Sequence, residues 1–310
     1  MVIPNTILPN FLVVGATKSG SSSLYHYLKQ HPDIYLPEIK EPLFFINEII
    51  EGLNNNDIAI KNENLINHLP KTIDDYILLF KKSKYFHKAI GECSASYLYY
   101  HKSSIPNIKK TLGDCKIIIL LRHPVDKAFS QYKHLRRLGA EVNSFNKALK
   151  LEEKRIRENF SALYHYRNQG LYSNQVKAFY DNFNNVKVIL TDDLQNSPKI
   201  VMNEIFSFLK VDSKINLDLS KKYNVTKFIP RNFYIHKLIY RSSLFSLIRR
   251  SSAFDLIRPK LKQKYYKINS DKIPQLTSSD RSYLLNTFNN DIKKLQELIK
   301  RDLTEWEPKY

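Results

Sequence analysis

The sequence of 310 residues has little of several residue types that would indicate a particular class of protein. Its two cysteines, Cys93 and Cys115, are too few for a disulfide framework and lack the spacing of a metal site, which indicates a reducing compartment and no resident metal. No apolar run reaches the roughly 18 residues that a membrane-spanning helix needs. The N-terminal segment also lacks the basic start and small-residue cleavage pattern of a signal peptide. We therefore expect a soluble, cytoplasmic protein.

Acidic residues are outnumbered, at 30 against 49 Lys and Arg, so the formal net charge is +19. The imbalance is largest in residues 221–270, which contain 13 Lys and Arg and a single acidic residue, Asp255. Such a stretch binds an anionic partner or forms a solvated basic face. Residues 233–250 also have the basic, amphipathic pattern of a helix lying on an anionic membrane, and a peripheral membrane contact is one interpretation. A lid over the acceptor is another. No motif for specific nucleic-acid binding accompanies these charges.

Glycine is scarce as well, at seven residues, and two glycines fall in one short stretch, residues 11–28 (FLVVGATKSGSSSLYHYL). The stretch has the pattern of a strand, a turn and a helix. Gly15 and Gly20 have the spacing of the phosphate-binding P-loop, but Ser21 stands where that motif has Lys, and the Lys lies inside the loop as Lys18. Main-chain N–H groups and the helix dipole suit a phosphate at such a turn. The predicted contacts are Lys18, Ser19, Gly20, Ser21, Ser22 and Ser23.

Short apolar runs alternate with helical patterns along most of the chain. Residues 116–121 (KIIILL) are the clearest strand, and four others are expected at 11–14, 34–36, 88–93 and 186–190. Helices are expected at 72–82, 124–138, 144–158, 171–183, 198–209 and 278–300. This order predicts an α/β fold: a single P-loop-like domain, residues 1–310, with about five parallel strands and helices on both faces. Residues 221–275 would form a basic acceptor or lid region within that domain.

The strand at 116–121 ends in Arg122, where a P-loop kinase or other nucleoside triphosphatase would have an Asp that holds Mg²⁺. A cation at this point predicts a second anion site at the carboxyl edge of the sheet. Ser130 follows eight residues later, and its hydroxyl together with the Arg122 guanidinium can hold one phosphate. A P-loop-like kinase is thus an alternative that lacks its metal carboxylate. A basic module that binds a nucleotide, a membrane or nucleic acid without catalysis is a second alternative.

The stretches GATKSGSSSLYHYL and RHPVDKAFSQYKH, at the separation found here, resemble the two nucleotide-binding signatures of sulfotransferases that use 3′-phosphoadenosine-5′-phosphosulfate (PAPS). The resemblance continues through HPDIYLPEIKEPLFF, GLYSNQVKAFYDNF and DIKKLQELIKRDLTEWEP, and it covers most of the chain from Phe11 to Trp306. Residues 46–85 and 232–275 match poorly. The resemblance implies transfer of a sulfuryl group to a hydroxyl or amine of an acceptor, with a carbohydrate or glycolipid favoured.

The same resemblance implies roles for individual residues. Lys18 would stabilise the leaving 5′-phosphate oxygen, Arg122 and Ser130 would hold the 3′-phosphate, and Glu41 would act as the base. Tyr172 and Arg231 would be further nucleotide contacts. One position departs from the pattern, since some glycan sulfotransferases carry a second catalytic Lys where this sequence has Cys93. We interpret Cys93 as a buried core residue.

Overall fold

A computed structural model describes residues 7–63, 69–220, 228–232, 234, 264–265 and 268–308. Within them, five strands form one all-parallel sheet in the order β2-β3-β1-β4-β5. All five predicted strands are confirmed, with ends within one or two residues of the prediction. They are β1 (Phe11–Gly15), β2 (Ile34–Tyr35), β3 (Ala89–Cys93), β4 (Lys116–Leu121) and β5 (Val186–Leu190).

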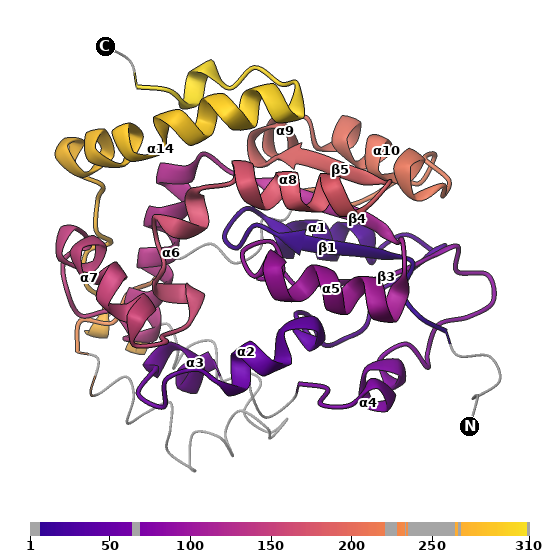
Figure 1. The fold of residues 1–310 in the computed structure, drawn as a ribbon, viewed down its shortest axis with the longest axis horizontal. Coiled ribbons are helices and arrows are strands. Elements are labelled where there is room, and N and C mark those ends of the chain that lie inside the picture. The colour runs from indigo at the N-terminus through magenta and orange to yellow at the C-terminus, as the bar shows by residue number, and fades with distance from the viewer. Residues whose placement is uncertain are drawn as a thin grey trace.

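Helices cover both faces of this sheet (Figure 1). The side chains of each strand alternate between two apolar clusters, so Phe11 and Val13 lie in one cluster and Leu12 and Val14 in the other. The first cluster is completed by α1 (Ser21–Leu28) and α10 (Pro198–Leu209), and the second by helices that include α5 (His101–Leu112), α8 (Ser173–Asn182) and α14 (Ser278–Ile299). Burial of both faces explains why the strands are continuously apolar.

Most predicted helices are confirmed. The bounds of α6 (Pro124–Leu138) and α10 agree with the prediction, and Ser144 caps the next predicted helix, α7 (Phe145–Arg157), by accepting from Lys147 N. The remaining elements are short: α2 (Asn47–Glu51), α3 (Ile58–Glu63), α4 (Ile73–Leu78), α9 (Thr191–Asn196), and the 3₁₀ turns η1 (Phe44–Ile46), η3 (Ala162–Tyr164), η4 (Asn168–Gly170) and η6 (Thr304–Trp306).

The structure differs from the prediction at two helices. The helix expected at 72–82 starts with the predicted Thr72 cap but ends at Leu78, because i→i+3 hydrogen bonds from Leu79 and Phe80 tighten the chain into turns. Helix α5 was not predicted, since Pro106 lies within it and Pro ordinarily ends a helix. Burial of Ile105 and Ile108 holds α5 against the sheet regardless.

Gly15 allows the end of β1 to approach the chain that follows β3. Its φ of +153° is open to glycine alone in practice, and a Cβ atom there would lie 2.5 Å from Leu98 Cβ and 2.8 Å from the carbonyl oxygen of Ala95. The close contact brings residues 15–20 and residues 95–98 together at the carboxyl edge of the sheet. That edge is where the predicted site residues converge.

The predicted amphipathic stretch 233–250 lies outside the described residues except for Tyr234. Among the residues that are described, no helix has the length and apolar character to span a membrane.

Candidate active site

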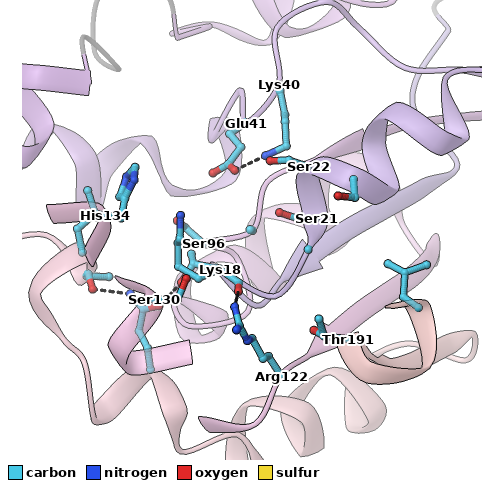
Figure 2. Close-up of a pocket in the computed structure, with 18 of the residues that line it drawn as sticks. Lys18, Ser21, Ser22, Lys40, Glu41, Ser96, Arg122, Ser130, His134 and Thr191 are labelled. Carbon is cyan, nitrogen blue, oxygen red and sulfur yellow. Dashed lines mark hydrogen bonds and ion pairs between the residues drawn. The ribbon is translucent and has the colours of Figure 1, made fainter. Parts of the chain in front are cut away.

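A cavity of about 550 Å³ opens at the carboxyl edge of the sheet. It is lined by the loop after β1, the segments after β3, β4 and β5, and parts of α6, α2 and α3. Figure 2 shows Lys40 and Glu41 on one side of the hollow, Arg122 and Thr191 on the other, and Lys18 between them. Eight of the predicted site residues line it: Lys18, Gly20, Ser21, Ser22, Ser23, Glu41, Arg122 and Ser130.

The loop after β1 presents main-chain N–H groups to this cavity. Gly20 adopts φ 97° as the N-cap of α1, and the first turn of that helix contains no acidic residue. The first N–H groups of a helix have no partner within the helix and attract an anion. Lys18 has φ 62°, an uncommon conformation for a residue with a side chain. The loop therefore combines an anion-binding helix end with one cation.

Thr191 fixes this loop through its side-chain hydroxyl, and the sequence analysis did not predict it as a site residue. Thr191 Oγ1 lies 2.7 Å from the carbonyl oxygen of Ser19 and 3.0 Å from that of Leu121, so one hydroxyl joins the loop after β1 to the end of β4. The available signal was its position, directly after the strand β5.

The second anion site lies at the end of β4 and on α6. Arg122 Nη1 donates to the carbonyl oxygen of Lys18 at 3.3 Å, which links the two predicted nucleotide-binding segments (Figure 2). Ser130 lines the cavity from α6, together with Lys133 and His134. Burial and the neighbouring Arg122 charge lower the pKa of Lys133. His134 Nδ1 accepts a hydrogen bond from Arg137 Nη2 at 3.0 Å.

Glu41 faces this cationic group from the opposite side. Its main-chain N–H donates to the carbonyl oxygen of Cys93 at 2.9 Å, and its φ of 61° is strained for a residue with a side chain. Lys40 Nζ lies 2.5 Å from Glu41 Oε1, and both side chains are about one-quarter exposed, at 21% and 27%. The Glu41 carboxylate is thus held at the cavity, and it has lone pairs that its ion pair with Lys40 does not use.

Comparison with known proteins identifies the family of the chain. The sequence profile described as "Sulfotransferase family" matches residues 9–214, about two-thirds of the chain. The chain belongs to the sulfotransferase family. A crystal structure of a sulfotransferase from Alicyclobacillus acidocaldarius is 31% identical and superposes with a TM-score of 0.75, covering 97% of this chain and 99% of that one.

Two curated relatives match shorter parts of this chain. The membrane-associated sulfotransferase kil1 of Dictyostelium discoideum is 33% identical over 125 residues, which is 40% of this chain and 22% of that protein. A bifunctional heparan sulfate N-deacetylase/N-sulfotransferase of Drosophila melanogaster is 26% identical over 236 residues, which is 71% of this chain and 21% of that protein. The chain spans about a fifth of the length of either relative.

Three predicted contacts do not line the cavity. Ser19 is buried within the loop after β1, and Tyr172 is buried with its hydroxyl donating to the carbonyl oxygen of Arg122 at 3.1 Å. Tyr172 thus supports the main chain at Arg122. Arg231 is exposed, and its main-chain N–H donates to the carbonyl oxygen of Asn269. A nucleotide contact from Arg231 stays a prediction.

Glu92, a buried carboxylate to which the sequence analysis gave no role, supports the segment that follows Glu41. Glu92 Oε2 accepts from Ser94 Oγ at 2.8 Å, and Oε1 accepts from the hydroxyls of Tyr97 and Tyr76. Ser94 Oγ in turn accepts from Leu43 N, and Tyr97 OH from Phe45 N. Burial raises the pKa of Glu92 to about 7. The nearby Glu41 charge adds to this rise, whereas the three hydrogen bonds lower the pKa and oppose it. The network fixes residues 43–45, which follow Glu41 directly.

A second buried network supports the loop after β1. Lys127 is fully buried, and its Nζ donates to the side-chain oxygens of Gln131 and Gln169, each 2.6 Å away. Gln169 Oε1 also accepts from Thr17 Oγ1 at 2.5 Å. Burial holds the pKa of Lys127 well below its ordinary value. Lys127 therefore positions the loop through Gln169 without lining the cavity.

Cys93 is buried, as predicted, and burial raises the pKa of its thiol to about 12. A thiol with such a pKa is protonated at neutral pH and is a poor nucleophile. Among the residues that the structure describes, no group of three or more His, Cys, Asp and Glu side chains is arranged to hold a metal ion.

Proposed function

We propose that this protein transfers the sulfuryl group of PAPS to a hydroxyl or amine of an acceptor, releasing adenosine 3′,5′-bisphosphate (PAP). The observation that carries the proposal is that two cationic side chains suited to bind anions, Lys18 and Arg122, line the same cavity as the carboxylate of Glu41. Family membership and the 0.75 TM-score to a bacterial sulfotransferase support the same activity. The acceptor oxygen would bond to sulfur while the bond from sulfur to the 5′-phosphate oxygen breaks.

Each of the two anion sites would bind one phosphate-bearing end of the PAPS donor. The N-terminus of α1 suits the 5′-phosphosulfate, because Ser21, Ser22 and Ser23 line the cavity and the first N–H groups of a helix have no partner within the helix. Arg122 and Ser130 would take the 3′-phosphate, for which the guanidinium supplies paired donors. The hydrogen bond from Arg122 to the carbonyl oxygen of Lys18 would keep the two sites at a set separation.

Lys18 would act on the leaving group. Negative charge develops on the 5′-phosphate oxygen as its bond to sulfur breaks, and an ammonium group held at that point stabilises the transition state more than the ground state. The support for this role is that Lys18 lies on the strained turn between the strand end and the helix N-terminus. A strained turn of this kind costs free energy, which the surrounding fold must offset.

Glu41 would accept the proton of the acceptor hydroxyl as the oxygen attacks sulfur. Its support is its position: the carboxylate lies across the hollow from Arg122, is part-buried and is fixed at its backbone by Cys93. Lys40 would hold the carboxylate in place through their ion pair before the acceptor arrives.

The test is a calorimetric titration with PAP in the presence of a metal chelator. We expect binding by the unaltered protein, and a loss of at least about tenfold in affinity in both Lys18→Ala and Arg122→Ala, because each removes a charge-assisted contact to phosphate. Lys199→Ala, an exposed lysine of α10, is the matched control and should leave the affinity unchanged. Equal affinity in all four proteins would refute the site, and turnover of ATP that requires Mg²⁺ would instead favour a kinase.

A further inference from the structure

The cavity contains a part that the proposed donor does not need. We call it the acceptor arm and define it by six lining residues that come from segments without a phosphate-binding motif: Leu43, Ile50, Ile60, Tyr100, Ser161 and Leu163. Two of them belong to α2 and α3, which lie on the opposite side of the sheet edge from α9 and α10 (Figure 1). The arm borders Glu41, the proposed base, because Leu43 follows it two residues later.

Buried hydrogen bonds hold the acceptor arm in one arrangement. Asp57 is 1% exposed, and its Oδ1 accepts from Ala59 N and Ile60 N at the start of α3. Its Oδ2 accepts from Ser161 N at 2.7 Å, so one carboxylate joins α3 to a segment 104 residues later. Tyr100 OH accepts from Ala162 N at 3.0 Å on the same segment. The wall is therefore built before any ligand binds, as expected of a binding site.

The acceptor arm is apolar, with one buried hydroxyl. Four of its six side chains are aliphatic, and Tyr100 adds an aromatic ring whose hydroxyl is already engaged. Ser161 is 3% exposed, and its Oγ has no hydrogen-bond partner among the described residues. A buried hydroxyl without a partner costs free energy, which a hydrogen bond from a ligand would offset.

Lys40 and Glu41 form an ion pair at the edge of the acceptor arm, and none of the six residues of the arm is charged. A polyanionic glycan placed on these six side chains would lose water from its carboxylates without gaining a cation from them. An uncharged molecule with an apolar portion would bury that portion against the aliphatic side chains.

We propose that the acceptor is an uncharged alcohol that carries an apolar chain, bound with the chain on the acceptor arm and with Ser161 as a hydrogen-bond partner. The inference rests on the proposed function and narrows its acceptor. In the reaction, the hydroxyl oxygen of the alcohol bonds to sulfur, its proton passes to Glu41, and PAP leaves with the electrons of the broken sulfur–oxygen bond. An alkyl glycoside is the simplest probe of this class, since it joins sugar hydroxyls to an aliphatic chain.

The experiment titrates the PAP-saturated protein with octyl glucoside below its micelle concentration, and in parallel with a uronate-containing oligosaccharide. Sulfate transfer from PAPS to each probe is measured on the same samples. Ser161→Ala removes a hydroxyl that has no partner within the described residues, so it preserves the fold, and Leu163→Asn changes a half-buried side chain. The matched controls, Ser207→Ala and Ile200→Asn, alter exposed residues of α10.

We expect octyl glucoside to bind and to be sulfated, and the oligosaccharide to do neither. Ser161→Ala should weaken octyl glucoside binding by about 3- to 10-fold and Leu163→Asn by about 10-fold, with both controls unchanged. A protein that binds PAP but not octyl glucoside, or whose binding is insensitive to both arm variants, overturns the inference and leaves the donor assignment intact. A protein that does not bind PAP overturns the proposed function itself.

Discussion

The two walls of the cavity are built in different ways. The donor wall consists of Lys18, the serines at 21–23, Arg122, Ser130 and Thr191, which lie on or directly after a strand end or on the helix that follows. The acceptor arm comes from short helices and turns that carry no motif and are joined by contacts between distant segments, such as Asp57 with Ser161. In the proposed function, donor recognition would follow from residues at strand ends. Acceptor recognition would follow from tertiary contacts, which are free to change without disturbing the sheet.

The largest effects should come from replacing the two side chains proposed to act in the reaction, Lys18 in the donor wall and Glu41 beside the acceptor arm. We expect Lys18→Met and Glu41→Gln each to lower the rate of sulfate transfer by roughly 10²- to 10³-fold, since one loses leaving-group stabilisation and the other the base. A PAP titration should distinguish the two variants, because Lys18→Met weakens PAP binding and Glu41→Gln does not. Transfer at an unchanged rate by Glu41→Gln would show that another group takes the proton.

A smaller effect should follow from loosening the acceptor arm alone. Asp57→Ala removes a buried carboxylate that accepts three main-chain hydrogen bonds, and we expect the free energy of unfolding to fall by about 2–4 kcal/mol. Urea denaturation measures this loss. The acceptor KM should rise while PAP affinity stays the same.

The control for Asp57→Ala is Asp74→Ala, which changes an exposed acid in the first turn of α4 and should alter neither quantity by much. If Asp57→Ala weakened PAP binding as strongly as acceptor binding, the two walls would not be independent.

The last effect concerns the pH dependence of the free energy of unfolding that the buried Glu92 contributes. Its pKa of about 7 in the folded state exceeds the ordinary value of 4.5, so between these two pH values the folded protein binds more protons than the unfolded chain. The contribution of Glu92 to stability is therefore complete below pH 4.5 and is lost as the pH rises through 7. We expect Glu92→Gln to remove this loss, which is about 1.4 kcal/mol for each pH unit between the two values and about 3 kcal/mol in all.

Urea denaturation of both proteins at several pH values between about 4.5 and 8 isolates this contribution, because His165 and all other groups are shared. The folded-state pKa of His165, lowered to about 4 by burial, gives an opposite slope in both proteins. Parallel pH curves for the two proteins would contradict a raised pKa of Glu92.

The donor wall was largely predictable from the sequence because its signals are local. Gly15, Lys18 and Gly20 lie within six residues of one another, and a buried strand places Arg122 at the same edge of the sheet. Thr191 escaped prediction, since a threonine after a strand has no distinctive pattern until Ser19 and Leu121 are seen beside it. The sequence predicts that Tyr172 touches the nucleotide, and that contact stays a prediction; in the fold its hydroxyl donates to the Arg122 carbonyl oxygen.

The sequence by itself determined the parallel sheet, its covering helices and the loop at 15–23, because apolar periodicity and turn residues act over a few positions. Only the tertiary structure decided the acceptor arm, the buried Lys127 and the raised pKa of Glu92. Each of these depends on which distant groups surround a side chain and on how much water they exclude. Residues 46–63, almost without pattern in the sequence, become a wall of the cavity because Asp57 finds its partner 104 residues away.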